Sequence, residues 1–485
     1  MPSSSLPIVW TKDATTDWVD GQLFRFMAEY EQTGDPYRVN FRNLCSNWSW
    51  AKRSDIYTHY MHRYPAKLLP YIPIFFLSSS LGGDDPILDS FAGTGTVAVE
   101  AIIHFTRPRD CKLVEINPLA RLISAAKTTP LDPRTLEKRA VELYAIIDKL
   151  KVSDVKIPRF PGIDFWFRKD TQIKLAVIRD SIELLEASFQ EKDFFWACCS
   201  SIIRDMSRAD PKVSPPVLLS ADKFAGNYKD KIQKMLEQKN QYDAFSVFKD
   251  VVYKNINRIR KLWDTWQNYG KRALVVGHDA RVLTESPYVG KGALDLTKEN
   301  QLPDNSIGMV ITSPPYINAQ KYTRTTKFEL WWLGLLEDTS EALSNYDKKL
   351  VGTERVAFKE YSELSTIGNK TADSYIERIY DTDRQKAGIV SKYFNDMKAS
   401  LKEIKRVLKP NGYCVLVIGN NLVSKQSIPN NQILSELAQE EGLIPRAMLV
   451  DEIRSRGLIT KRHETAGIIA DEWILLLQKP ILEYN

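Results

Sequence analysis

Residues 86–95 of the chain read Pro-Ile-Leu-Asp-Ser-Phe-Ala-Gly-Thr-Gly. The apolar pair that follows the proline predicts a short buried strand ending at Asp89, and an apolar helical pattern follows the second glycine. A second short apolar strand ends at Glu115, and Asn117-Pro118 then begins another helix. This alternation of strands and helices predicts an α/β fold with a doubly wound, mostly parallel sheet.

The chain has 485 residues, which is too many for one ordinary core. Residues 1–130 carry the alternation described above, whereas residues 131–272 have a mostly helical pattern and predict a large insertion or second domain. The strand pattern resumes in residues 273–485. Within that part, a polar segment at about 337–385 has too few apolar residues to predict a core of its own.

The composition is that of a globular protein, with 43% hydrophobic and 26% charged residues and a net charge of +6. No run approaches the roughly 18 apolar residues of a membrane helix, and the start of the chain lacks the pattern of a secretory signal. The cysteines form no Cys-x-x-Cys pair, so we expect no metal site and a reducing, cytoplasmic setting. We expect Cys198-Cys199 and Trp331-Trp332 to pack in the core.

A second informative stretch is Thr-Ser-Pro-Pro-Tyr at 312–316, which follows the apolar run 307–311 and predicts a buried strand ending in a rigid loop. An exocyclic amino group of a nucleic-acid base is a poor nucleophile because its lone pair is delocalised into the ring. Two acceptors directed at its N–H bonds favour a tetrahedral nitrogen with an available lone pair. The Ser313 hydroxyl and the Pro314 carbonyl can be these acceptors, held in place by the prolines. Tyr316 offers a ring on which the base can stack.

A near copy of this stretch is Ser-Pro-Pro at 214–216. Because of this copy, Ser-Pro-Pro alone is weak evidence for a catalytic loop, and the flanking residues decide the interpretation. The copy lies in a polar, proline-rich segment, with no strand before it and no aromatic residue after it. We interpret it as a surface loop.

The glycine turn and two acidic residues predict a ligand site. Gly93 and Gly95 permit a close ligand approach at the carboxyl end of a strand, although a tight turn without a ligand is the alternative. Glu115, about 20 residues further on, could accept both hydroxyls of a ribose, or it could be a solvated loop residue. Asp279 ends the third strand, where it could accept from the amine of an adenine or cap a helix.

Taken together, these motifs resemble those of the S-adenosylmethionine-dependent amino methyltransferases of DNA, which have a Rossmann-like sheet. The resemblance covers residues 63–67, 91–95, 115–118, 279–281 and 312–316, the last of which looks like the catalytic motif of the N4-cytosine subgroup. It implies S-adenosylmethionine as cofactor and methyl transfer to the N4 amino group of a flipped-out cytosine. The cofactor-binding residues that it implies are Tyr64, Pro65, Ala66, Lys67, Asp89, Phe91, Ala92, Gly93, Thr94, Gly95, Glu115, Asn117, Asp279, Ala280 and Thr312. The catalytic residues that it implies are Ser313, Pro314, Pro315 and Tyr316.

Other activities stay open. Ser313 favours cytosine N4 because most N6-adenine enzymes carry Asp or Asn there, but some adenine enzymes carry serine. Methylation of cytosine carbon 5 is disfavoured, because no cysteine follows a proline in this chain. An RNA or small-substrate amino methyltransferase, and a nucleic-acid-binding protein with a degenerate cofactor fold, are the remaining alternatives.

The resemblance implies double-stranded DNA as substrate, and a cognate restriction endonuclease is a further possible partner. Residues 131–272 lie where one class of the family places its target-recognition domain. Membrane and metal partners are not expected. The candidate DNA contacts are Lys321, Arg324, Lys327, Arg454 and Arg456.

Overall fold

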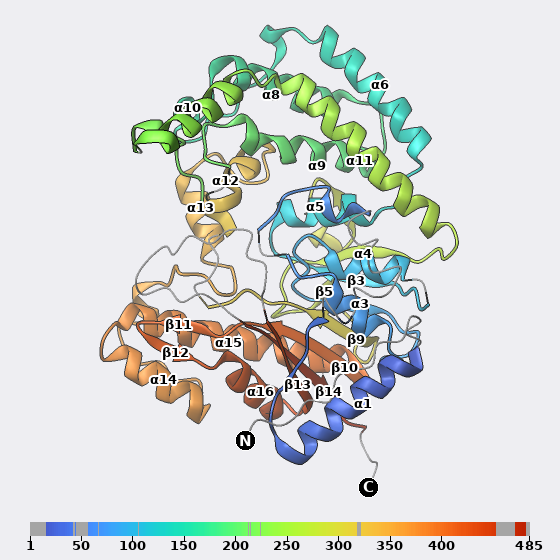
Figure 1. Ribbon diagram of the computed structural model, residues 1–485, viewed down its shortest axis with the longest axis vertical. Helices are drawn as coiled ribbons and strands as arrows, with labels where there is room; N and C mark the ends of the chain where they lie inside the picture. Colours follow the sequence, from blue (N-terminus) through green and yellow to red (C-terminus); the bar gives the residue numbers. More distant parts are fainter. Residues whose placement is uncertain are drawn as a thin grey trace.

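A computed structural model describes residues 16–41, 44, 57–65, 67–104, 106–211, 213, 215–223, 225–317, 322–452 and 471–481. Its centre is an eight-stranded sheet (Figure 1). In their order across the sheet, the strands are β1 (Tyr37–Arg38), β13 (Ile444–Glu452), β14 (Asp471–Gln478), β10 (Leu408–Ile418), β9 (Ile307–Thr312), β2 (Ile87–Asp89), β3 (Cys111–Val114) and β4 (Ala273–Gly277).

The sheet is doubly wound and mostly parallel, which confirms the prediction. Only β14 runs antiparallel to its neighbours, β13 and β10. The chain proceeds outward from β2 through β3 to β4 on one side, and from β9 to β10 on the other. The strand order therefore reverses between β2 and β9, and such a switch point leaves a crevice outside the carboxyl ends of the strands.

Both faces of the sheet are buried, and alternate residues of one strand enter different cores. In β9, Met309 and Ile311 pack into one core and Val310 into the core on the opposite face. This double burial explains why residues 307–311 form a continuous apolar run. The first face is covered by α1 (Thr16–Thr33), α3 (Tyr71–Leu77) and α4 (Thr96–Ile103). The second face is covered by α14 (Lys370–Tyr380), α15 (Arg384–Val407) and α16 (Asn430–Glu440).

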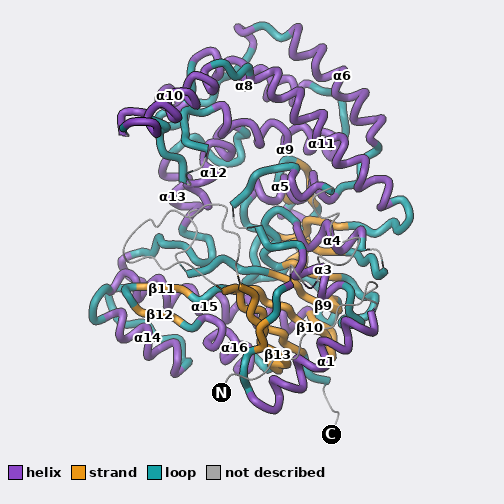
Figure 2. Tube along the Cα trace, in the orientation of Figure 1, coloured by secondary structure: helices purple, strands orange, loops and turns teal. Residues whose placement is uncertain are grey.

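A block of helices stands beside the sheet, as the sequence predicted for residues 131–272 (Figure 2). It contains α6 (Pro133–Lys149), α7 (Ile163–Trp166), α8 (Lys169–Leu184), α9 (Phe189–Met206), α10 (Gly226–Asn240) and α11 (Ala244–Trp266). Its core is shared with α5 (Pro118–Thr128) and α12 (Tyr322–Trp332), which come from outside the block. The division into separate domains therefore stays a prediction.

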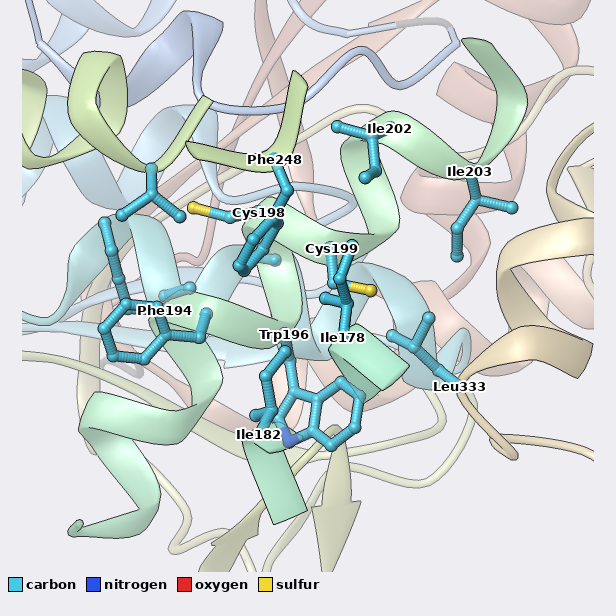
Figure 3. Close-up of a cluster of buried hydrophobic side chains, with 14 of the residues drawn as sticks. Ile178, Ile182, Phe194, Trp196, Cys198, Cys199, Ile202, Ile203, Phe248 and Leu333 are labelled. Atoms are coloured by element: carbon cyan, nitrogen blue, oxygen red, sulfur yellow. The ribbon is translucent and has the colours of Figure 1, made fainter. Parts of the chain in front are cut away.

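The centre of this block is densely apolar. Cys198 and Cys199 of α9 lie among Phe194, Trp196 and other buried side chains (Figure 3). Leu333, just after α12, reaches into the same cluster (Figure 3). Trp331 and Trp332 are buried there too, so the prediction that both pairs are core residues is confirmed.

Two expectations about local structure were wrong. The polar segment 337–385 does contribute to a core, because α14 places Ala372, Ile376 and Ile379 on one buried helical face. The sequence of residues 58–81 predicts a loop that enters a helix at residues 63–67, but the helix α3 begins only at Tyr71, after Pro70 at its N-cap. The strands β1 and β13 were not predicted from the sequence.

The remaining elements are short. They are η2 (Thr58–Tyr60), η3 (Val152–Asp154), η4 (Ala221–Lys223), η5 (Leu296–Lys298), η6 (Phe358–Glu360), α13 (Ser340–Asp347), and the strand pairs β5 (Thr284–Glu285) with β8 (Asn300–Gln301), β6 (Tyr288–Gly290) with β7 (Ala293–Leu294), and β11 (Asn421–Val423) with β12 (Gln426–Ile428). Among the described residues, no helix is long and apolar enough to cross a membrane.

Candidate active site

A pocket opens at the carboxyl ends of β2, β3, β4 and β9, at the switch point of the sheet. With its open mouth included, it measures about 940 Å³. Its lining residues are Tyr64, Lys67, Leu68, Asp89, Ser90, Phe91, Ala92, Gly93, Thr94, Thr96, Glu115, Ile116, Asn117, His278, Asp279, Ala280, Ser313, Pro315, Leu350 and Val351. Segments that are distant in sequence therefore meet at one cavity.

The two glycines of the turn have different surroundings. Both adopt positive φ, +50° at Gly93 and +73° at Gly95. A Cβ at Gly93 would have no atom of the described residues within 4 Å, whereas a Cβ at Gly95 would lie 3.0 Å from Cβ of Ser124. Gly93 therefore keeps space open at the pocket, and Gly95 lets α4 approach α5. The sequence assigned both glycines to ligand contact, but Gly95 does not line the pocket.

Asp89 joins the glycine turn to the strand that precedes the predicted catalytic loop. The Thr312 hydroxyl donates a 2.7 Å hydrogen bond to Oδ1 of Asp89, and the backbone N–H of Phe91 donates to Oγ1 of Thr312 at 2.9 Å. Burial raises the pKa of Asp89 to about 7, and the hydrogen bonds from Thr312 and Phe91 oppose that rise. Thr312 is fully buried, so it holds the turn and does not line the pocket.

Glu115 follows β3 and fixes two backbone segments. Its Oε2 accepts from the N–H of Gly93 at 2.7 Å, and its Oε1 accepts from the N–H of Asn117 at 2.8 Å. Burial raises the pKa of Glu115, and these backbone hydrogen bonds oppose the rise. Each carboxylate oxygen has a second lone pair, so Glu115 can still accept from a ligand.

Asn117 connects two sides of the pocket. Its Oδ1 accepts from the N–H of Leu119 and so caps α5, while its Nδ2 donates to the Tyr64 hydroxyl at 3.0 Å. The segment that carries Tyr64 and Lys67 is thereby tied to the end of β3. Pro65, expected in the same site, does not line the pocket, and Ala66 lies outside the described residues.

Asp279 lines the pocket but is already held by Arg281. The guanidinium of Arg281 donates to Oδ1 at 2.9 Å and to Oδ2 at 2.7 Å, and its backbone N–H also donates to Oδ1. Burial acts to raise the pKa of Asp279, but the hydrogen bonds from Arg281 outweigh it and lower the pKa. The alternative role as a helix N-cap is wrong, because no helix begins at residues 279–283.

In the predicted catalytic loop, Ser313 and Pro315 line the pocket, whereas Pro314 is buried and is not among the lining residues. The Ser313 hydroxyl has no hydrogen-bond partner among the described residues. Tyr316 is only partly buried and packs against the core beside α14 and α15, outside the pocket lining. Its role as a stacking surface stays a prediction.

Sequence reasoning missed the segment 346–352, which reaches both the pocket and the loop. Leu350 and Val351 line the pocket. Gly352 has φ of +76°, and a Cβ there would lie 2.9 Å from the carbonyl oxygen of Tyr316. Asp347 accepts a 2.6 Å hydrogen bond from Thr323 of α12. The apolar pair followed by glycine in a polar stretch was the available signal. His278, Ile116, Leu68, Ser90 and Thr96 also line the pocket and were missed.

Two lysines fix the backbone around the pocket, the buried Lys127 and the half-buried Lys67, which also lines the pocket. The ammonium of Lys127 donates to the Thr94 carbonyl at 2.6 Å, and burial lowers the pKa of Lys127. Lys67 donates to the carbonyls of His59 and His62, and burial lowers the pKa of Lys67 to about 8. These bonds fix the backbone on two sides of the cavity.

The described candidate DNA contacts both lie on α12. Arg324 forms a 2.8 Å ion pair with Glu354, and the Lys327 ammonium lies 5.0 Å from the ring centroid of Trp166. Lys321, Arg454 and Arg456 lie outside the described residues. Within the described part of the chain, no group of His, Cys, Asp and Glu side chains is arranged to hold a metal ion.

Comparison with known proteins gives two curated relatives, whereas no family model matches the chain. The chain is 27% identical over 453 residues to the type II methyltransferase M.MvaI of Kocuria varians. The alignment covers 87% of this chain and 91% of that protein. It is 24% identical over 200 residues to the type II methyltransferase M.BsoBI of Geobacillus stearothermophilus, covering 36% of this chain and 39% of that protein.

Among solved structures, a Thermus thermophilus protein assigned as a DNA modification methylase matches with 20% identity and a TM-score of 0.15. That match spans 19% of this chain and 39% of the other, so it is confined to a short segment. The long alignment with M.MvaI shows that this chain is homologous, over most of its length, to a type II methyltransferase.

Proposed function

We propose that the chain is a DNA methyltransferase that uses S-adenosylmethionine and methylates the exocyclic N4 amino group of cytosine. One observation carries the proposal. The hydrogen bond from Thr312 to Asp89 places the glycine turn and the loop that holds Ser313 at a single pocket. The homology to a type II methyltransferase supports the same reaction class.

The pocket fits the proposed cofactor in its polar groups as well as its position. Ser90 and Thr94 line it, and their hydroxyl oxygens are buried without a hydrogen-bond partner among the described residues. Unsatisfied buried polar atoms are costly, so a ligand that pairs with them is favoured. Gly93 leaves open space beside them. In this proposal Asp89 faces the amino-acid end of the cofactor and Glu115 accepts from its ribose.

When bound, the cofactor would supply an electrophilic methyl group. The chain's own residues hold the target amino group. The Ser313 hydroxyl and the Pro314 carbonyl accept its two N–H bonds, and this favours a lone pair directed at the methyl carbon. Pro315 stiffens the loop, so the acceptors need little reorganisation. Ser313 does not act as a strong base, because the nitrogen loses its proton readily after methylation.

The substrate in this proposal is double-stranded DNA with the target base flipped out of the helix. Residues 131–272 are the proposed target-recognition unit. A cognate restriction endonuclease is a proposed partner.

Transfer of labelled methyl groups to DNA, followed by nucleoside analysis, tests the proposal. We expect N4-methylcytosine. Recovery of N6-methyladenine alone would show that the target is the N6 amino group of adenine instead. Methylation of structured RNA but not of duplex DNA would show that the substrate is RNA and not DNA. Absence of cofactor binding in calorimetry would instead favour a nucleic-acid-binding protein with a degenerate cofactor fold.

A further inference from the structure

The helix α12 exposes one narrow edge to solvent, and the side chains on that edge are cationic. From Thr323 to Leu333, every residue is buried except Arg324 and Lys327. These two cations are three positions apart, so they lie on the same face of the helix. The helix begins shortly after the loop that carries Ser313, and it packs between the helical block and the rest of the chain (Figure 1).

At the Arg324 end, this edge opens onto a groove with a cationic excess. The groove is lined by Arg324, Lys348, Glu354, Arg355, Val356, Asp383, Gln385, Lys386 and Ile389. Four of these side chains are cationic and two are carboxylates. Arg324 pairs with Glu354, Lys386 with Asp383 and Arg355 with Asp347, and the small excess of positive charge that remains favours an anionic ligand such as a phosphate.

At the Lys327 end, the same edge continues into aromatic rings of the helical block. The Lys327 ammonium lies over the Trp166 ring, and the Trp166 ring meets Phe165 edge-on with centroids 5.0 Å apart. Phe165 is 51% exposed, although a ring of its size gains stability from burial. Arg208, itself exposed, donates to the backbone carbonyl of Phe165 at 3.4 Å, which adds a further cation next to this residue.

We propose that Arg324, Lys327 and Phe165 form a track for one strand of the substrate DNA. The two cations contact its phosphates, and Phe165 stacks on an unpaired base. Cationic grooves that alternate with aromatic rings are the common solution for holding a single strand. Extrusion of a base breaks its pairing and so provides a locally unpaired strand beside the catalytic loop. The inference rests on the proposed function and extends it to the residues that hold the strand.

Binding of a fluorescein-labelled oligothymidine, measured by anisotropy over a series of salt concentrations, tests the track. Phe165→Ala should weaken binding about tenfold or more, with the salt dependence unchanged, because it removes stacking and no charge. Lys327→Gln and Arg324→Gln should each weaken binding and lower the slope of log K against log salt by about 0.7. Matched controls are Phe24→Ala, an exposed ring on α1, and Lys138→Gln, an exposed lysine on α6. Both controls should bind as the wild type does.

The outcomes separate this inference from the proposed function. If the wild type methylates DNA but the track variants bind like the controls, the track is wrong and the function stands. Variants with lower thermal stability but unchanged affinity would show that these contacts only join the helical block to α12. That result would also contradict the proposed track. If the wild type neither binds nor methylates DNA, both proposals fail.

Discussion

The Thr312 hydroxyl donates a 2.7 Å hydrogen bond to the buried carboxyl of Asp89, and this bond joins two stretches that lie 223 positions apart in the chain. Asp89 ends β2 and Thr312 ends β9, the two strands at which the sheet order reverses. A change at either residue therefore affects the glycine turn and the loop of Ser313 together.

Thr312→Val should disturb both functions of the site. The variant keeps the side-chain shape but leaves Asp89 without its hydroxyl donor, at a cost of about 1.5–3 kcal/mol in the free energy of unfolding. We expect both cofactor affinity and turnover to fall, as measured by calorimetry and methyl transfer. Thr128→Val is the control, because that buried hydroxyl donates only to the Ser124 carbonyl within α5. Equal behaviour of the two variants would contradict the joining role of Thr312.

Cofactor binding should be coupled to a proton on Asp89. Its pKa of about 7 in the folded protein lies above the ordinary value of 3.8, so the folded state keeps a proton that the unfolded state loses. This group therefore makes the protein less stable as pH rises from about 4 to about 7. A ligand ammonium favours the carboxylate, so affinity should rise with pH up to about 7, with proton release below that pH.

Calorimetry in buffers of different ionisation enthalpy measures that proton release. Asp89→Asn should bind the cofactor more weakly, without this proton release. If the wild type and Asp89→Asn show the same pH dependence of affinity, Asp89 is not the titrating group.

The two glycines of the turn should respond differently to alanine. Gly95→Ala forces a Cβ to 3.0 Å from Ser124, so we expect thermal stability to fall. Gly93→Ala meets no protein atom within 4 Å, so cofactor affinity should fall more than stability does. Both variants share the cost of positive φ, so the comparison isolates the contacts. A loss of affinity for Gly95→Ala alone would reverse this assignment.

Gly352 should set the position of the loop that carries Ser313. In Gly352→Ala the new Cβ would lie 2.9 Å from the Tyr316 carbonyl oxygen, so we expect turnover to fall more than cofactor affinity. Gly334→Ala is the matched control, since it has φ of +66° and nothing within 4 Å. Both variants should lose about 1–2 kcal/mol of stability from positive φ, and Gly352→Ala should lose more because of its contact with Tyr316. Unchanged turnover in Gly352→Ala would exclude this contact as a constraint on the loop.

Sequence periodicity was sufficient for the strands whose ends build the pocket. Short apolar runs predicted β2, β3, β4 and β9, and the residue after each run fell at the same edge of the sheet. Asp89, Glu115, Asp279 and Ser313 line the pocket for that reason, and their roles in binding and catalysis stay predictions. The parallel sheet follows from the same pattern, because strands buried on both faces are continuously apolar.

Contacts between distant segments could not be predicted in the same way. Leu350 and Val351 enter the pocket because the chain folds back after α13, and the apolar pair before Gly352, which was the local signal, does not encode that return. Gly95 looked like a ligand contact until the proximity of Ser124 gave it a packing role. The strand β13 was missed because its residues include Pro445 and Arg446, which interrupt the apolar pattern.

In the proposed function, the loop that carries Ser313 holds the target base while the glycine turn holds the cofactor. The most direct test is methyl transfer from labelled S-adenosylmethionine to duplex DNA by the wild type and Ser313→Ala, with cofactor affinity measured in parallel. We predict N4-methylcytosine from the wild type, and a large loss of turnover with near-normal cofactor affinity in Ser313→Ala. A wild type that binds the cofactor but leaves DNA unmethylated, or a Ser313→Ala variant that loses cofactor binding instead of turnover, would contradict the account.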